Sequence, residues 1–116
     1  MERFQAVLRL KIHPGKTEEF KRVVEDSVRI ARANSPGTVR YDAFLNDDET
    51  EAVVHEAFLS PTARLEHIAA LGNNFAAMLG IVDMHADVLD GADRALRASA
   101  EGYNVRFYKP FLRLAA

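Results

Sequence analysis

The chain has 116 residues, of which 48% are apolar and 28% charged, and its formal net charge is −2. This length and mixture are typical of one globular domain spanning residues 1–116, and they exclude a disordered chain. Acidic and basic residues are interleaved without a basic stripe, which argues against a nucleic-acid partner, and the absence of cysteine excludes disulfides and thiolate chemistry.

The first residues contain no apolar signal segment, and no apolar run reaches the length of about 18 residues that crosses a bilayer. We therefore expect a cytoplasmic protein without membrane contact.

The elements follow from the periodicity of the apolar residues. Residues 4–12 alternate apolar and polar side chains and predict a strand, and residues 16–34 follow helical spacing. The segment 34–37, Asn-Ser-Pro-Gly, ends that helix. Residues 38–46 and 51–59 predict a hairpin whose polar turn spans residues 47–50.

The second half of the chain repeats this plan. Ser60 followed by Pro61 predicts the start of a helix that continues to about Leu79. Three further elements are expected, which are a strand over residues 84–90, a short helix over 92–100 and a strand over 105–114. The order predicts an α+β fold of the ferredoxin-like βαββαβ type, with an antiparallel sheet, two helices on one face, and a C-terminal short helix and strand.

Two helices cover only one face of such a sheet. The uncovered face would carry a mixture of apolar, charged and histidine side chains, namely Val7, Arg9, Phe44, Val53, His55, Ala57, Leu59, His85, Asp87 and Leu89. This mixture favours an interface with internal ion pairs, and we expect a two-fold homodimer that packs sheet on sheet. The alternative is that the last strand and short helix fold back over this face.

Two residues on the helix-covered side are candidates for proton chemistry. Glu56 falls between Val54 and Phe58, so it is either a general base or ligand anchor with a raised pKa, or the partner of a helix Arg or Lys. His67 lies at the margin of the second helix's apolar stripe, where it either moves protons near neutral pH or bonds a backbone carbonyl.

Other polar residues are weaker candidates. Asn73, Asn74 and Phe75 follow Gly72, and they either line a cavity at a loosened helix turn or form an exposed polar turn. Tyr41 is either a hydrogen-bond donor to an oxygen-bearing ligand or a half-buried tyrosine. The alternating Asp83, His85 and Asp87 have no recognised metal-ligand spacing, so we expect ion pairs there and no metal site.

Two segments resemble the antibiotic biosynthesis monooxygenase (ABM) family. Residues 35–42, Ser-Pro-Gly-Thr-Val-Arg-Tyr-Asp, resemble the family's proline-glycine…tyrosine segment. Residues 53–58, followed by Ser60, Ala63 and His67, resemble its second signature, a strand with a glutamate leading into a helix with an alanine and a histidine. The resemblance covers roughly residues 4–90.

The resemblance implies a dimeric α+β barrel with a small-molecule pocket between the second helix and the sheet. It implies that His67 and Glu56 line this pocket and are catalytic, with His67 as the proton acceptor and Glu56 orienting a neighbour or the substrate. It implies substrate contacts from Asn73, Asn74, Phe75 and Tyr41. The implied activity is cofactor-independent oxidation of a phenolic, quinol or polyketide-like substrate. An acid–base isomerase and a non-catalytic dimeric binding protein are the alternatives. The chain has no tryptophan, unlike several oxygenase and haem-degrading members, which argues against haem degradation.

Overall fold

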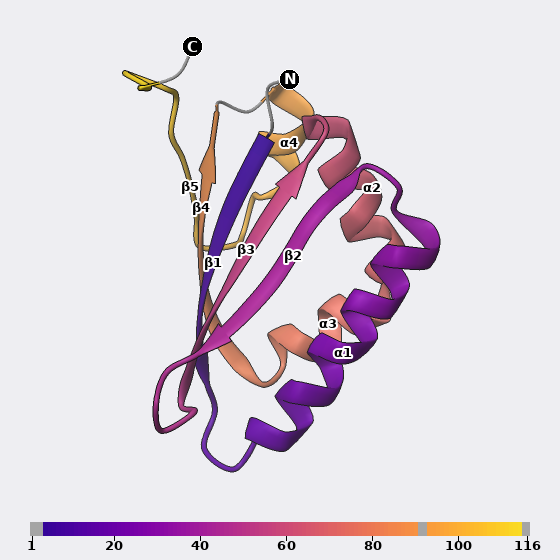
Figure 1. Ribbon diagram of the computed structural model, residues 1–116, viewed down its shortest axis with the longest axis vertical. Coiled ribbons are helices and arrows are strands. Elements are labelled where there is room, and N and C mark those ends of the chain that lie inside the picture. The colour runs from indigo at the N-terminus through magenta and orange to yellow at the C-terminus, as the bar shows by residue number, and fades with distance from the viewer. Residues whose placement is uncertain (1–3, 91–92, 115–116) are drawn as a thin grey trace.

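The computed structural model describes residues 4–90 and 93–114, and its elements form two layers (Figure 1). In chain order they are β1 (Phe4–Ile12), α1 (Thr17–Asn34), β2 (Thr38–Leu45), β3 (Glu51–Phe58), α2 (Pro61–Leu71), α3 (Asn73–Leu79), β4 (Val82–Leu89), α4 (Arg94–Ser99) and β5 (Val105–Phe107). The strands form one sheet in the order β2-β3-β1-β4-β5, in which only β4 and β5 run parallel. The predicted α+β class and ferredoxin-like order are confirmed.

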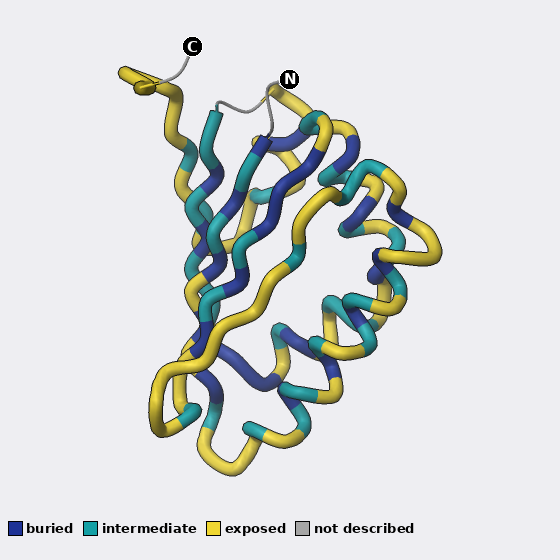
Figure 2. Tube along the Cα trace, viewed as in Figure 1, coloured by how far each residue is buried: buried dark blue, intermediate teal, exposed yellow. Residues whose placement is uncertain are grey.

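The core lies between the sheet and its helices. In β1 every second residue, from Phe4 to Ile12, is buried, and the same alternation marks the central strands in Figure 2. The strand register sets Leu8 opposite Val54 of β3 and Ala86 of β4, so three neighbouring strands present apolar side chains to the same layer. These side chains pack against Phe20 of α1 and Met78 of α3.

The predicted single helix from Pro61 to Leu79 is wrong, because the helix is broken at Gly72. Gly72 has φ of 49° and ψ of −122°, a backbone conformation that side chains with a Cβ strongly disfavour. Its N–H still donates to the carbonyl of Ile68, which closes the last turn of α2, and Asn73 then begins α3. The expected loosening after Gly72 is therefore a change of helix direction.

The last predicted strand, residues 105–114, is shorter in the structure. Val105 to Phe107 pair with Ala86 to Val88, and the N–H of Tyr108 donates to the carbonyl of Val88 at 2.8 Å. Because β4 ends at Leu89 and Pro110 has no N–H, the ladder stops there. The chain continues as an exposed tail, residues 108–114, in which the exposed fractions of the apolar side chains are 96% for Phe111, 82% for Leu112 and 108% for Leu114.

The short helix α4 packs on the same side of the sheet as the other helices. Residue 92, the first of the predicted helix, lies outside the described residues. Leu96 of α4 is 1% exposed and belongs to a cluster with Phe4, Phe58 and Val88, on the helix-facing side of the sheet. Within residues 4–90 and 93–114, the opposite face is therefore not covered by α4, and the alternative in which this helix folds back over it does not hold.

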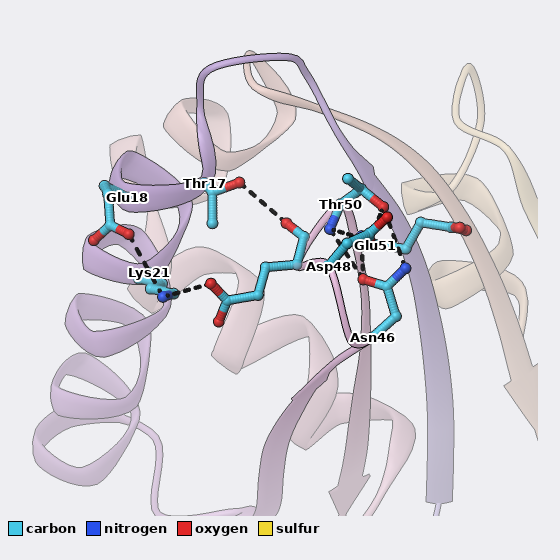
Figure 3. Close-up of polar contacts among 8 residues, drawn as sticks. Thr17, Glu18, Lys21, Asn46, Asp48, Thr50 and Glu51 are labelled. Carbon is cyan, nitrogen blue, oxygen red and sulfur yellow. Dashed lines mark hydrogen bonds and ion pairs between the residues drawn. The ribbon is translucent and has the colours of Figure 1, made fainter.

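The turn between β2 and β3 is tied to the start of α1 (Figure 3). Thr17 Oγ1 donates to the carbonyl of Glu49 at 3.0 Å, and Lys21 Nζ donates to the Glu49 carboxylate at 3.1 Å. Inside the turn, the Asn46 side-chain oxygen accepts from the N–H groups of Thr50 and Glu51. The turn predicted to be solvated is thus held by hydrogen bonds, both within itself and to α1.

No helix in the described part of the chain combines the length and apolar character needed to cross a membrane.

Candidate functional site

A buried cluster of ionisable side chains lies where β3 meets α2. Glu56 is 3% exposed and is flanked along β3 by the fully buried Val54 and Phe58. Strand alternation points it toward the helices, and its neighbours across the sheet are Ala6 of β1 and Tyr41 of β2. A carboxyl group in such surroundings requires a partner.

Glu56 finds that partner on α2. Ser60 caps this helix by accepting from the N–H of Ala63 at 3.1 Å, with Pro61 at its first position. Arg64 and His67, one turn apart, then face the same strand. Arg64 Nη2 lies 3.3 Å from Glu56 Oε1, and His67 Nε2 lies 3.8 Å from Glu56 Oε2. The ion pair with a helix arginine, one of the two readings of Glu56, is therefore present.

Close backbone packing brings β2 into the cluster. A Cβ atom built on Gly37 would lie 2.6 Å from the Cβ of Ala63, so only glycine fits here without a shift. This approach brings the next residue, Thr38, to α2, where its Oγ1 lies 3.2 Å from His67 Nδ1. The Pro-Gly segment and Ala63, both part of the sequence resemblance, are thus neighbours in space.

His67 is held as a neutral ring. Its side chain is 1% exposed and lies between the rings of Tyr41 and Phe58, at centroid distances of 5.4 and 5.3 Å. Burial, followed by the nearby charge of Arg64, lowers the pKa of His67 to about 4. Its Nδ1 contacts a side-chain hydroxyl instead of the backbone carbonyl considered above, and its Nε2 has no hydrogen-bond partner within the described residues.

The two neighbouring acids are also perturbed. Burial raises the pKa of Glu56, against the opposing charge of Arg64. Burial, with the charge of Glu56 as a second cause, raises the pKa of Tyr41. Because the Glu56 pKa rises and the His67 pKa falls, a single proton taken up by this pair belongs on Glu56, with His67 neutral beside it.

A cavity of about 140 Å³ lies next to the cluster, under α2 and α3. One half of its lining comes from α2, α3 and β4, namely Arg64, Ile68, Phe75, Met84, Ala86 and Val88. The other half comes from α4, the following loop and β5, namely Leu96, Ser99, Ala100, Tyr103, Val105 and Phe107. Arg64 belongs both to this lining and to the ion pair with Glu56, so it connects the cavity to the buried cluster.

The structure brings some of the predicted site residues together and separates others. Glu56, His67 and Tyr41 lie side by side in the cluster, although they are not in the cavity lining. Phe75 lines the cavity, with its ring 6.4 Å from that of Tyr103.

The two asparagines lie elsewhere. Asn74 is turned toward α1, where its amide donates to Ser27 Oγ at 2.7 Å and to the carbonyl of Val23 at 3.0 Å. Asn73 is exposed at the start of α3.

Arg64 is the functional candidate that the sequence analysis did not single out. One signal pointed to it, which is its position three residues before His67 on an α-helix whose facing strand carries a glutamate. Tyr103 and the rest of the α4 wall gave no such signal, because their place over the cavity depends on how the chain returns after β4.

The outer face of the sheet carries the predicted ion pairs. Asp87 lies 2.7 Å from His85 Nε2 and 3.7 Å from Arg9 Nε, and His55 bonds Gln5 at 2.8 Å. A second hollow of about 580 Å³ opens on this face between β2 and β4. Among the residues that the structure describes, no three metal-ligating side chains cluster.

The fold and the buried acid–base cluster under α2 define a ferredoxin-like α+β protein with a small cavity beside that cluster. The sequence profile described as antibiotic biosynthesis monooxygenase matches residues 3–71, more than half of the chain. The protein belongs to the antibiotic biosynthesis monooxygenase family. No curated protein matches this sequence.

Several solved structures share the fold. MupZ from Pseudomonas fluorescens is 15% identical, with a TM-score of 0.83 over 100% of this chain and 96% of that one. SnoaB from Streptomyces nogalater, a cofactor-independent oxygenase, is 18% identical, with a TM-score of 0.67 over 76% of this chain and 91% of its own. Rv0793 from Mycobacterium tuberculosis is 21% identical, with a TM-score of 0.68 over 81% and 99%. At these identities the likeness is one of fold.

Proposed function

We propose that this protein is a cofactor-independent monooxygenase that oxidises a small phenolic, quinol or polyketide-like substrate. One observation carries the proposal, which is an apolar cavity whose lining includes Arg64, the residue that is also paired with Glu56, beside a neutral His67. Membership of the family and the shared fold with the cofactor-independent oxygenase SnoaB support it.

The first step is ionisation of the substrate. A phenolic hydroxyl that enters the cavity meets Arg64, whose charge favours the ionised oxygen in a low-dielectric setting. Because Glu56 does not line the cavity, the proton reaches it through Arg64, which gives a proton to Glu56 and takes the phenolic one. Burial has raised the pKa of Glu56, which favours this transfer, and the cluster keeps the same total charge. His67 stays neutral and holds its place through Thr38.

The second step needs molecular oxygen and the substrate alone. The electron-rich anion reduces oxygen, one oxygen atom forms a new C–O bond at a carbon that loses its hydrogen, and the other leaves as water. The substrate supplies every electron that oxygen accepts, so hydroquinone would give hydroxybenzoquinone and water. The protein's share is to bind the anion, take its proton and keep bulk water out.

Oxygen consumption tests the proposal. We expect uptake with hydroquinone, and a loss of at least tenfold in kcat/KM in Arg64→Met and Glu56→Gln. Arg22→Met, an exposed change on α1, is the matched control and should keep wild-type activity. Equal oxygen uptake in the wild type and Arg64→Met would show that the cavity is not the reaction site.

An acid–base isomerase is the second candidate, favoured by the free Nε2 of His67 at 3.8 Å from Glu56. Such a pair exchanges protons without oxygen. Turnover of a small carbonyl compound under anaerobic conditions, with deuterium incorporated from solvent, would favour it over the oxygenase. Ligand binding with neither reaction would leave a small-molecule-binding protein.

We also propose that two copies of the chain pack through the outer faces of their sheets. On this face Phe44 is 57% exposed and Leu59 is 45% exposed, while on the neighbouring strands β1 and β4 the charge of Asp87 is paired with Arg9 and His85. The apolar tail of residues 108–114 leaves the sheet on the side of the molecule away from α1 (Figure 1). A second copy of the same chain offers both of these apolar surfaces a partner of matching chemistry.

A further inference from the structure

The cavity is close in size to one aromatic ring. Its volume is about 140 Å³, and an engineered apolar cavity of about 150 Å³ in another protein holds benzene. Its lining is mostly apolar or aromatic, with Phe75 and Tyr103 side by side at a centroid distance of 6.4 Å. A planar ring therefore fits, whereas a second fused ring requires the wall to move.

The wall formed by α4 and β5 is firmly built. Asp93 caps α4 by accepting from the N–H of Leu96 at 2.9 Å, and Ser99 Oγ donates to the carbonyl of Leu96 at 2.7 Å. The N–H of Ala86 donates to the carbonyl of Asn104 at 2.9 Å, which ties the end of the loop to β4. Leu96 itself is 1% exposed, so its side chain is a fixed boundary of the cavity.

One charged group faces this space from the opposite side. The Arg64 side chain is 12% exposed, and its Nη2 reaches Glu56 at 3.3 Å. Its Nε is buried and donates to no acceptor in the described part of the chain. Leaving a buried N–H group without an acceptor costs free energy. An anionic oxygen in the cavity would accept a hydrogen bond from Arg64 and would balance part of the guanidinium charge.

We propose that the cavity binds a single aromatic ring carrying one anionic oxygen, with that oxygen at Arg64 and with Leu96 and Tyr103 as the residues that exclude larger rings. This inference rests on the proposed function for the location of the site and narrows its substrate class. It makes Leu96 and Tyr103 specificity-determining residues, and Arg64 the residue that recognises charge.

Calorimetric binding of four probes tests the charge and size requirements. The anions 4-nitrophenolate and benzoate should both bind. Comparing their affinities shows whether the site prefers a phenolate or a carboxylate. Nitrobenzene, which lacks the anionic oxygen, and 2-naphthoate, which has a second ring, should each bind at least tenfold more weakly. Equal affinity for nitrobenzene or for 2-naphthoate would overturn the charge or the size requirement.

Variants locate the binding. Arg64→Met should weaken 4-nitrophenolate at least tenfold and remove the preference over nitrobenzene, whereas Arg22→Met should not. Leu96→Ala should admit 2-naphthoate, and Tyr103→Ala, at a half-exposed position, provides the same test if the buried change prevents folding. Val39→Ala, an exposed position on β2 outside the cavity lining, is the matched control. If neither wall variant improves 2-naphthoate binding, the wall assignment is wrong.

The binding experiment and the oxygen experiment test different claims, so either claim can be contradicted while the other stands. One-ring anions that bind as expected, without oxygen uptake on any quinol, would end the oxygenase proposal and leave this inference standing. Oxygen uptake on anthrone, together with equal wild-type affinities for 2-naphthoate and benzoate, would support the oxygenase proposal and overturn the one-ring size requirement.

Discussion

Arg64 balances the charge of Glu56 in a place that water barely reaches. Their side chains are 12% and 4% exposed, so removing the cation leaves a buried carboxyl group without a counter-ion. Such a break typically costs about 3 kcal/mol or more. This loss of stability would be separate from any loss of ligand binding.

We therefore predict that Arg64→Met lowers the free energy of unfolding at pH 7 by about 3 kcal/mol, measured by urea denaturation. Combining it with Glu56→Gln should recover part of this loss, because the neutral amide needs no counter-ion. A double variant that shows the plain sum of the two single losses would mean that the residues do not interact.

The pH dependence of stability should report on His67. In the unfolded chain His67 takes up a proton below about pH 6.5, whereas in the folded protein it stays neutral down to about pH 4. Because the unfolded state binds more protons in this window, His67 makes stability fall as pH falls through it. Glu56 acts in the opposite sense, because its raised folded pKa makes stability fall as pH rises above its unfolded value of 4.5.

Comparison of variants separates the two contributions. Between pH 7 and pH 5 the wild type should lose about 2 kcal/mol more than His67→Gln does, in urea denaturation at both pH values. Arg22→Met, an exposed change that removes no group titrating in this window, should keep the wild-type difference. If His67→Gln loses as much stability as the wild type, His67 is not held neutral in the folded state.

At the scale of elements, the approach of β2 to α2 fixes the site. Gly37→Ala would place a Cβ 2.6 Å from that of Ala63, and we expect a loss of about 1 to 3 kcal/mol from this overpacking. Gly80→Ala is the control, because its new Cβ meets only ordinary contacts at 3.5 Å or more. Thermal unfolding of both variants checks the prediction.

A rescue experiment shows whether the contact itself is responsible. Adding Ala63→Gly to Gly37→Ala should restore more stability than the two single effects predict, since the second change removes the atom that clashes. Strict additivity would mean that the loss comes from the backbone of Gly37 alone.

Sequence periodicity predicted most elements, because apolar alternation and caps are local signals. Residues 4–12 and the Ser60-Pro61 start are examples, and both are confirmed. The break at Gly72 was missed because a lone glycine inside a helical pattern is compatible with a continuous helix. The extent of β5 depends on where its partner β4 ends, which the tail's own apolar residues do not reveal.

The candidate site was partly predictable for the same reason. Strand alternation placed Glu56 on the helix-covered side, and helical spacing placed His67 near it. The direction of Asn74, toward Ser27 of α1, depends on how two helices lie side by side, and no local pattern encodes that.

At the scale of the whole molecule, the uncovered sheet face and the tail determine the expected assembly. We predict a dimer at micromolar concentration by analytical ultracentrifugation, because both surfaces expose large apolar side chains. Phe44→Ser with Leu59→Ser should raise the dissociation constant at least tenfold, and replacing Phe111 and Leu112 with serine tests the tail. Ala33→Ser, at an exposed position of α1, should leave the dissociation constant unchanged. A chain that sediments alone would contradict this packing.

The division of the cavity between two stretches of chain has an evolutionary consequence. The charge cluster of Glu56, Arg64 and His67 lies within residues 3–71, the part that matches the family, whereas α4 and β5 follow later. Mutations in the later stretch can reshape the cavity without touching Glu56, Arg64 or His67. Related chains can thus differ in the shape of this cavity while they keep the same buried cluster of ionisable side chains.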